Sequence, residues 1–218
     1  MFEFIEGCYN PHQNADRIAE TGLCEAPLWS SMRFDLVARV TRSLLMAILC
    51  PFAAFGDQTD TRLDQLFAML QSSENAVEQR ETELAIWEIW YAVGRDDVDA
   101  LMEAGGEAVR SGQLERAEEI FTRVTELAPE FSEGWNRRAT VRYHRRDYAG
   151  SLNDIERTLV LEPRHFGAIW GKGMILGLQR DFPAAIQTFE RLLEITPYSR
   201  DAKRRIELLK NEQKKNSV

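Results

Sequence analysis

Hydrophobic and polar positions recur with a fixed period between residues 98 and 197. Pro129, Pro163 and Pro197 each close an apolar segment and lie 34 residues apart. Counting back from each proline, one column holds small residues, a second large apolar residues, and a third Leu or Ile. These columns are Ala117, Ser151 and Ala185; Phe121, Ile155 and Phe189; and Leu127, Leu161 and Ile195. Such a period indicates stacked copies of one supersecondary unit.

The first half of each unit also has small and large apolar residues at fixed positions. Gly105, Ala139 and Gly173 form a small column, four residues after Leu101, Trp135 and Ile169. Apolar residues at helical spacing in both halves predict two antiparallel helices, which approach closely where their side chains are small. The proline ends the second helix because it lacks an amide hydrogen and clashes with the preceding turn. One hairpin cannot bury its apolar faces alone, so neighbours must stack.

The period and the order of the small, large and proline columns resemble the tetratricopeptide family. The resemblance covers three repeats, at about 98–131, 132–165 and 166–199. It implies an all-α fold, an α-solenoid of stacked antiparallel helix hairpins. It also implies a non-catalytic scaffold or adaptor whose groove binds a protein or peptide.

Helices are also expected on both sides of the repeats. Residues 57–97 predict a degenerate first repeat, near 62–94, with apolar faces around Phe67 and Trp90 but no closing proline. Terminal repeats are usually atypical because one side meets solvent. Residues 199–218 predict a polar capping helix and tail. Ile206, Leu208 and Leu209 would cover the last repeat, while the basic residues, Arg205 among them, would face water.

Residues 32–56 show the three-part pattern of a secretory signal peptide. Arginines follow Met32, residues 43–55 are an uncharged apolar run, and Ala54 and Gly56 are small where signal peptidase requires it. The apolar run is shorter than the roughly 20 residues of a membrane-spanning helix. We therefore expect cleavage after Gly56, a bacterial periplasmic location and no stable membrane insertion of the mature chain.

Other interpretations of this segment stay open. The pattern starts at Met32, so residues 1–31 are interpreted as lying outside the native protein or as disordered. Residues 43–55 are alternatively a buried amphipathic segment of a cytosolic protein, or an uncleaved anchor. Lipid attachment at Cys50 is disfavoured because Ile48 and Leu49 stand where small residues are needed.

Composition narrows the function classes. The formal net charge of -8 argues against nucleic-acid binding, which needs a basic surface. The three cysteines and three histidines have no zinc-type spacing, so no metal site is expected. No catalytic or nucleotide-binding motif is found, so neither catalytic residues nor a cofactor are expected. The rival functions are a cytosolic adaptor, a regulatory subunit of an enzyme complex, and a hydrolase that uses His144.

Candidate binding residues lie on the second and third repeats. The expected peptide-groove residues are Asn136, Arg137, Thr140, Tyr143, His144, Trp170, Met174 and Leu178. Residues 137–146 hold five arginines, which on one interpretation pair with glutamates on adjacent helices. On the other, Asn136, Thr140, Tyr143 and His144, which resemble groove-facing positions of the family, receive an acidic or C-terminal peptide with the help of Arg137. The lysine of the family's carboxylate clamp is missing, so a receptor for chaperone tails is not expected.

Two further features have both a structural and a functional interpretation. Gly167, Gly171, Gly173 and Gly177 fall in one helix, where each costs roughly 1 kcal/mol relative to alanine. They indicate either a helix held by its neighbours or a smooth apolar groove. His165 is expected to be a helix cap or a packing residue, and Trp87, Trp90 and Trp135 are expected in the core.

Overall fold

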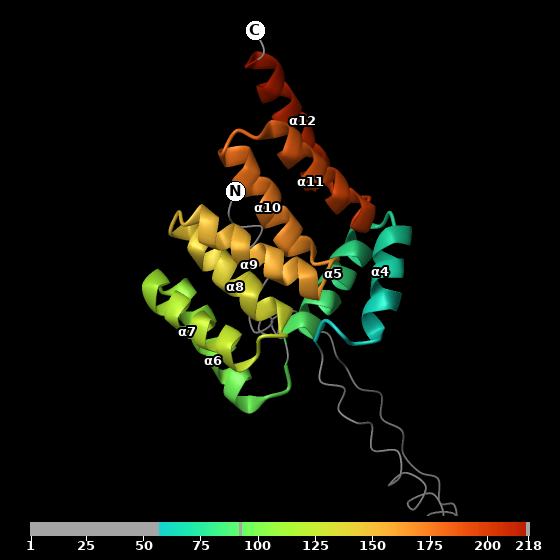
Figure 1. Ribbon diagram of the computed structural model, residues 1–218. Coiled ribbons are helices and arrows are strands. Elements are labelled where there is room, and N and C mark those ends of the chain that lie inside the picture. The colour runs from blue at the N-terminus through green and yellow to red at the C-terminus, as the bar shows by residue number, and fades with distance from the viewer. Residues whose placement is uncertain (1–56, 92, 217–218) are drawn as a thin grey trace, which may run out of the picture. The chain divides into compact units, whose positions relative to one another are not determined.

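The computed structural model describes residues 57–91 and 93–216, which form nine helices and no strand (Figure 1). They are α4 (Arg62–Ser72), α5 (Ala76–Tyr91), α6 (Asp96–Arg110), α7 (Leu114–Leu127), α8 (Ser132–His144), α9 (Tyr148–Leu161), α10 (Phe166–Leu178), α11 (Phe182–Ile195) and α12 (Arg200–Lys215). The prediction of an all-α fold is confirmed. The expected signal peptide at 32–56 and residues 1–31 lie outside the described residues.

Helices α6 to α12 stack in chain order as antiparallel hairpins. Each helix from α6 to α11 packs along the next one. Helices α8, α10 and α12 begin at Ser132, Phe166 and Arg200, which are 34 residues apart. The second helices α7, α9 and α11 each end two residues before the repeat's proline, as the loss of an amide hydrogen at proline requires. The predicted α-solenoid is therefore confirmed.

The small columns allow the two helices of a hairpin to touch. A Cβ placed on Gly105 would lie 2.6 Å from the Phe121 ring, and one on Gly173 would lie 2.7 Å from the Phe189 ring. In the middle repeat, Ser151 donates a hydrogen bond of 2.8 Å to the carbonyl of Ala139. Small side chains on one helix thus make room for large ones on the other.

Side-chain caps fix where several helices begin. Asp147, His165, Asp181 and Ser199 accept backbone N–H groups at the starts of α9, α10, α11 and α12. Each cap satisfies a backbone donor that has no partner within its helix. His165, expected as a cap or as a packing residue, is a cap and is also fully buried.

Helix α12 covers the last repeat, but with a different set of side chains from the one expected. Ala202, Ile206 and Leu209 are buried against the repeats. Leu208, predicted to join them, is 47% exposed, because it lies on the opposite side of the helix from Ile206. Arg205, predicted to face water, is half-buried.

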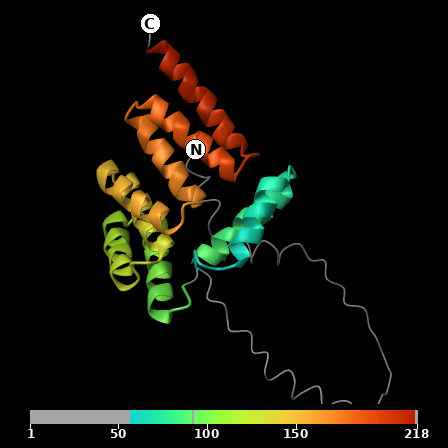
Figure 2. The same ribbon diagram turned by 45° about the vertical axis from the view of Figure 1, so that its right-hand side comes forward.

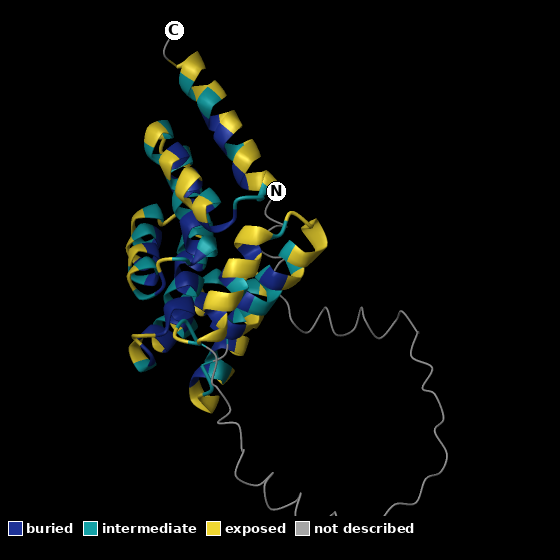
Figure 3. Ribbon diagram, turned by 90° about the vertical axis from the view of Figure 1, so that its right-hand side faces the viewer, coloured by how far each residue is buried: buried dark blue, intermediate teal, exposed yellow. Residues whose placement is uncertain are grey.

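The α4–α5 hairpin lies beside the repeats instead of at the start of the stack (Figure 2). Helix α4 approaches α11, and α5 approaches α8. Buried residues of the hairpin form one hydrophobic cluster with those of α10, α11 and α12. A first repeat stacked on α6, as the sequence predicts for residues 57–97, would instead pack α5 along α6 in the way that α7 packs along α8. In Figure 3, exposed residues lie on the outer side of α4, and buried residues lie on the side that faces the repeats.

Candidate functional site

Two tryptophans of α5 pack on the N-terminal end of α10. The Trp90 ring stacks on the His165 ring, with centroids 4.2 Å apart and planes inclined by 9°. Trp87 meets His165 and Phe166 edge-on, at centroid distances of 5.4 and 5.2 Å. A Cβ on Gly167 would lie 2.6 Å from the Trp87 ring. Helix α10 therefore carries a seat for Trp87 that only glycine leaves open.

His165 also belongs to a buried polar cluster. Nδ1 of His165 accepts the backbone N–H of Ala168 at 3.2 Å, so in the neutral ring the proton is on Nε2. That nitrogen lies 3.0 Å from Oε2 of Glu133 on α8. Glu133 also accepts hydrogen bonds from Asn136 at 2.8 Å and from Arg137 at 2.7 Å. The cluster ties the N-terminal ends of α8 and α10 together.

The surrounding donors keep Glu133 ionised although it is fully buried. Burial alone would raise the pKa of Glu133. The charge of Arg137 and the hydrogen bond from His165 outweigh burial and hold this pKa below its ordinary value. Asn136 and Arg137, two of the predicted groove residues, are thus engaged within the chain.

The last residue of α5 reaches α6 and α8. The hydroxyl of Tyr91 donates a hydrogen bond of 3.2 Å to the carbonyl of Met102 on α6. The guanidinium of Arg137 lies 5.1 Å from the centre of the Tyr91 ring. Near the middle of α5, burial raises the pKa of Glu83; the charge of Arg80 opposes this shift, and the charge of Asp201 on α12 adds to it. Helix α5 therefore runs past α12, α10, α8 and α6.

The other six predicted groove residues lie further along α8 and α10, beyond the seat of α5. We call Thr140, Tyr143, His144, Met174 and Leu178, together with Arg205 of α12, the open strip; all six are at least partly exposed. Leu178 is 52% exposed. Arg205 extends to the strip, with Nη2 2.7 Å from Sδ of Met174. The sixth predicted residue, Trp170, packs edge-on against Phe189 with ring centroids 5.1 Å apart, which gives it a structural role.

Arg205 is a site residue that the sequence did not indicate. Within residues 57–91 and 93–216, no carboxylate lies at ion-pair distance from its guanidinium, which sits half-buried beside Met174. The sequence signal was weak, because Arg205 is one of many basic residues on a polar helix. Only the stacking of α12 next to α10 brings it to the strip.

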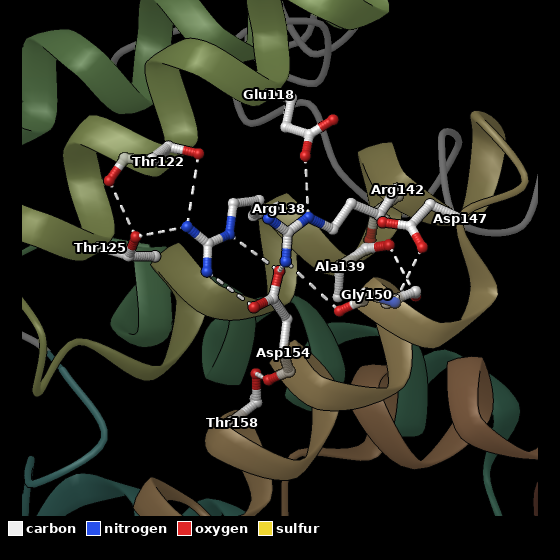
Figure 4. Close-up of polar contacts among 12 residues, drawn as sticks. Glu118, Thr122, Thr125, Arg138, Ala139, Arg142, Asp147, Gly150, Asp154 and Thr158 are labelled. Atoms are coloured by element: carbon white, nitrogen blue, oxygen red, sulfur yellow. Dashed lines mark hydrogen bonds and ion pairs between the residues drawn. The ribbon is translucent and has the colours of Figure 1, made fainter.

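The arginines of residues 137–146 are largely used inside the repeat stack (Figure 4). Arg138 makes two hydrogen bonds to Asp154, of 2.9 and 2.8 Å, and one of 2.9 Å to Thr125. Arg142 joins Asp154 to Glu118 through contacts of 2.9 Å, and Arg145 also pairs with Glu118. Pairing with adjacent helices therefore describes this patch better than an open receptor for acidic peptides.

Packing accounts for the glycines of α10. Beyond Gly167 and Gly173, a Cβ on Gly171 would lie 3.4 Å from Ile155, and one on Gly177 would lie 3.3 Å from Leu209. These neighbours belong to α9 and α12. Because other elements approach α10 on several sides, its glycines reflect close packing instead of a smooth apolar groove.

Among residues 57–91 and 93–216, no group of His, Cys, Asp or Glu side chains has the arrangement of a metal site. None of the helices there has the length and apolar character needed to span a membrane.

Known proteins of similar sequence share the repeat pattern. The family model described as tetratricopeptide repeat matches residues 102–157 and 136–200. A TPR repeat-containing protein of Rhizobium etli is 32% identical over 148 residues, which cover 68% of this chain and 72% of the relative. Tetratricopeptide repeat protein 36 of Homo sapiens is 29% identical over 164 residues, covering 73% of this chain and 80% of the relative.

Solved structures share the fold at lower sequence identity. The first TPR of Spaghetti (RPAP3), bound to an HSP90 peptide, superposes with a TM-score of 0.51 at 18% identity, covering 53% of this chain and 92% of that one. The Yersinia enterocolitica type III secretion chaperone SycD, in complex with a peptide of the translocator YopD, gives 0.51 at 13% identity, covering 55% and 96%. At these identities the likeness concerns the fold alone.

Proposed function

The chain belongs to the tetratricopeptide repeat family, and from that premise we propose that it is a non-catalytic scaffold that binds a protein or peptide on the open strip. The observation that carries this proposal is the exposure of Leu178 and Met174 next to the half-buried guanidinium of Arg205. Large apolar side chains beside a charged group, clear of α5, offer a partner both contact area and orientation. Two structures of similar fold were solved with bound peptides, which supports the same kind of ligand here.

The partner chemistry follows from the side chains of the strip. Tyr143, Met174 and Leu178 would contact apolar side chains of the partner, since aromatic residues and Met are enriched in interface cores. Arg205 would receive a carboxylate of the partner, through a charge-assisted hydrogen bond. We thus propose an apolar segment with at least one acidic residue, held without the missing clamp lysine.

Affinity capture with matched variants tests this proposal. Leu178→Glu places a charge in the strip, and Val160→Glu places the same charge on α9, where Val160 is 71% exposed. We expect the wild-type chain and Val160→Glu to retain the same partner, and Leu178→Glu to lose it. Equal retention by all three would contradict the assignment of the strip, and retention of nothing by the wild type would contradict the scaffold itself.

We also propose that the protein acts in a bacterial periplasm, after cleavage of residues 32–56 as a signal peptide. The charged start, the apolar run and the small residues at positions 54 and 56 support this. Cell fractionation followed by N-terminal sequencing provides the test. The expected product begins at Asp57 in the periplasmic fraction. A cytosolic chain that retains residues 32–56 would contradict the proposal.

A further inference from the structure

Helix α5 lies across the N-terminal ends of α8 and α10 and next to α6 and α12, as a bound helix would. We call this face of the four helices the inner ends of the repeats. Helix α5 contacts α10 through Trp87 and Trp90 and reaches α8 and α6 through Tyr91, while Glu83 lies within the electrostatic influence of Asp201 on α12. These helices belong to successive repeats, which otherwise touch only their neighbours. A single helix that contacts every repeat has the geometry of a ligand laid across a solenoid.

The repeats provide two seats that fit this helix. Gly167 is the second residue of α10, and the space that its missing side chain leaves is filled by Trp87. The His165 ring is held parallel to Trp90 by its two hydrogen bonds, to Glu133 and to the backbone of Ala168. Both seats lie at the start of α10, so two aromatic rings three positions apart on one helix reach them together.

Polar contacts and ring contacts both hold the hairpin to the repeats. The polar contacts include those from Gln71 to the carbonyl of Glu194, from Tyr91 to the carbonyl of Met102, and between Asp64 and Arg164. The indole Nε1 of Trp90 is buried and has no hydrogen-bond partner among the described residues. An occupant with a hydrocarbon ring in that place would avoid this loss.

The repeats also pack on one another directly. Helices α6 to α12 contact one another in chain order, and the ion pairs between α7, α8 and α9 involve no residue of the hairpin. The hairpin adds apolar residues to the core of α10, α11 and α12, so a helix that displaces α5 must cover the same apolar surface.

We propose that the inner ends of α6, α8, α10 and α12 form a helix-binding surface, that α5 is its built-in ligand, and that an amphipathic partner helix with two aromatic residues three positions apart displaces α5. This surface is separate from the open strip, so it adds a second binding mode that α5 regulates. Residues 76–91 are themselves the first example of the ligand.

A labelled synthetic peptide of residues 76–91 tests the proposal with the full-length chain. Ala85→Pro in the chain breaks α5, because proline cannot continue a helix interior, and it changes no residue of the repeats. We expect the peptide to bind Ala85→Pro at least about tenfold more tightly than the wild type, whose surface is occupied. A peptide with both tryptophans changed to Ala should not bind, and adding Gly167→Leu to the Ala85→Pro chain should abolish binding.

Two outcomes would overturn the proposal. One is a folded Ala85→Pro chain, by circular dichroism, that does not bind the peptide; the other is equal binding by the wild type. If Ala85→Pro does not fold, hydrogen exchange of the wild type decides: amides of α5 should exchange through an opening that leaves α8 and α9 protected. Exchange of all these helices only together would refute displacement. Leu178→Glu should not affect binding of the peptide, so the outcome of this test does not depend on whether the open strip binds a partner.

Discussion

At the scale of single residues, Glu133 organises the contact between the repeats and α5. Its carboxylate accepts hydrogen bonds from His165, Asn136 and Arg137 in a site without solvent. Removing the carboxylate would take these hydrogen bonds from the buried side chains of His165 and Asn136, and a buried donor without an acceptor loses its full solvation. Glu133 therefore stabilises the fold mainly because its removal would leave buried donors without an acceptor.

We predict that Glu133→Ala lowers the free energy of unfolding by about 3 kcal/mol, as expected for breaking a buried charged cluster. Urea denaturation followed by circular dichroism measures it. Glu130→Ala is the control, because Glu130 makes only an exposed ion pair with Arg157 and should cost less than about 1 kcal/mol. Similar effects of the two substitutions would mean that the buried cluster stabilises the fold no more than an exposed ion pair does.

The lowered pKa of Glu133 also predicts a pH dependence. The folded state binds this proton less readily than the unfolded state, in which the pKa is near the ordinary value of 4.5. The stabilisation is therefore complete above that value and is lost as the pH falls below it. We expect the difference in stability between the wild type and Glu133→Gln to shrink as the pH falls below 4.5, measured by urea denaturation from pH 7 downwards. A constant difference would contradict the assignment.

Adjacent glycines in α6 provide a matched pair. A Cβ on Gly105 would lie 2.6 Å from the Phe121 ring, whereas one on Gly106 would meet nothing closer than 3.5 Å. Gly105→Ala should lower stability by about 1–3 kcal/mol through overpacking. Gly106→Ala should raise it by about 0.5–1 kcal/mol through helix propensity. Thermal unfolding of both variants measures the contrast, and equal shifts would mean that hairpin packing does not constrain Gly105.

At the scale of helices, the sequence predicted packing between residues of the same repeat. It did not predict packing between helices that are far apart in the chain. The reason for Gly105 lies in the same repeat, at Phe121, so the 34-residue columns identified it. The reason for Gly167 is Trp87, on a helix outside the repeats. Hydrophobic spacing predicted helices in residues 62–94, but spacing alone does not say which surface an amphipathic hairpin covers. The stacking of Trp90 on His165 could not be predicted for the same reason, although the role of His165 as a cap or packing residue could.

The ion pairs between α7, α8 and α9 give an element-scale prediction. Asp154 is bound by both Arg138 and Arg142, and its side chain is almost fully buried. Asp154→Ala would leave two guanidinium groups short of a partner, so we expect a loss of about 3 kcal/mol or more. Glu156→Ala, at an exposed position of the same helix, should change stability by less than about 0.5 kcal/mol. Urea denaturation compares the two, and equal losses would show that the network is not stabilising.

At the scale of the whole described unit, the hairpin changes how the repeats cooperate. In a linear stack each repeat stabilises only its neighbours, so distant repeats unfold nearly independently. Here residues of α4 and α5 share a core with α10, α11 and α12, while Tyr91 reaches α6. The hairpin thus contacts the first and last repeats directly, as well as α8 of the middle one. This long-range connection should make unfolding more cooperative than the repeats alone would allow.

Trp90→Ala tests that connection, because Trp90 is fully buried between α5 and α10. We expect it to lower stability by about 3–5 kcal/mol. We also expect the unfolding curves of tryptophan fluorescence and circular dichroism to coincide in the wild type and to separate in Trp90→Ala, since the two ends of the stack would no longer be joined. Trp135→Ala is the control: Trp135 is half-buried and packs with Arg138, within the stack, so its loss should lower stability while the two curves still coincide. Coincident curves in Trp90→Ala would show that cooperativity passes through the repeats alone.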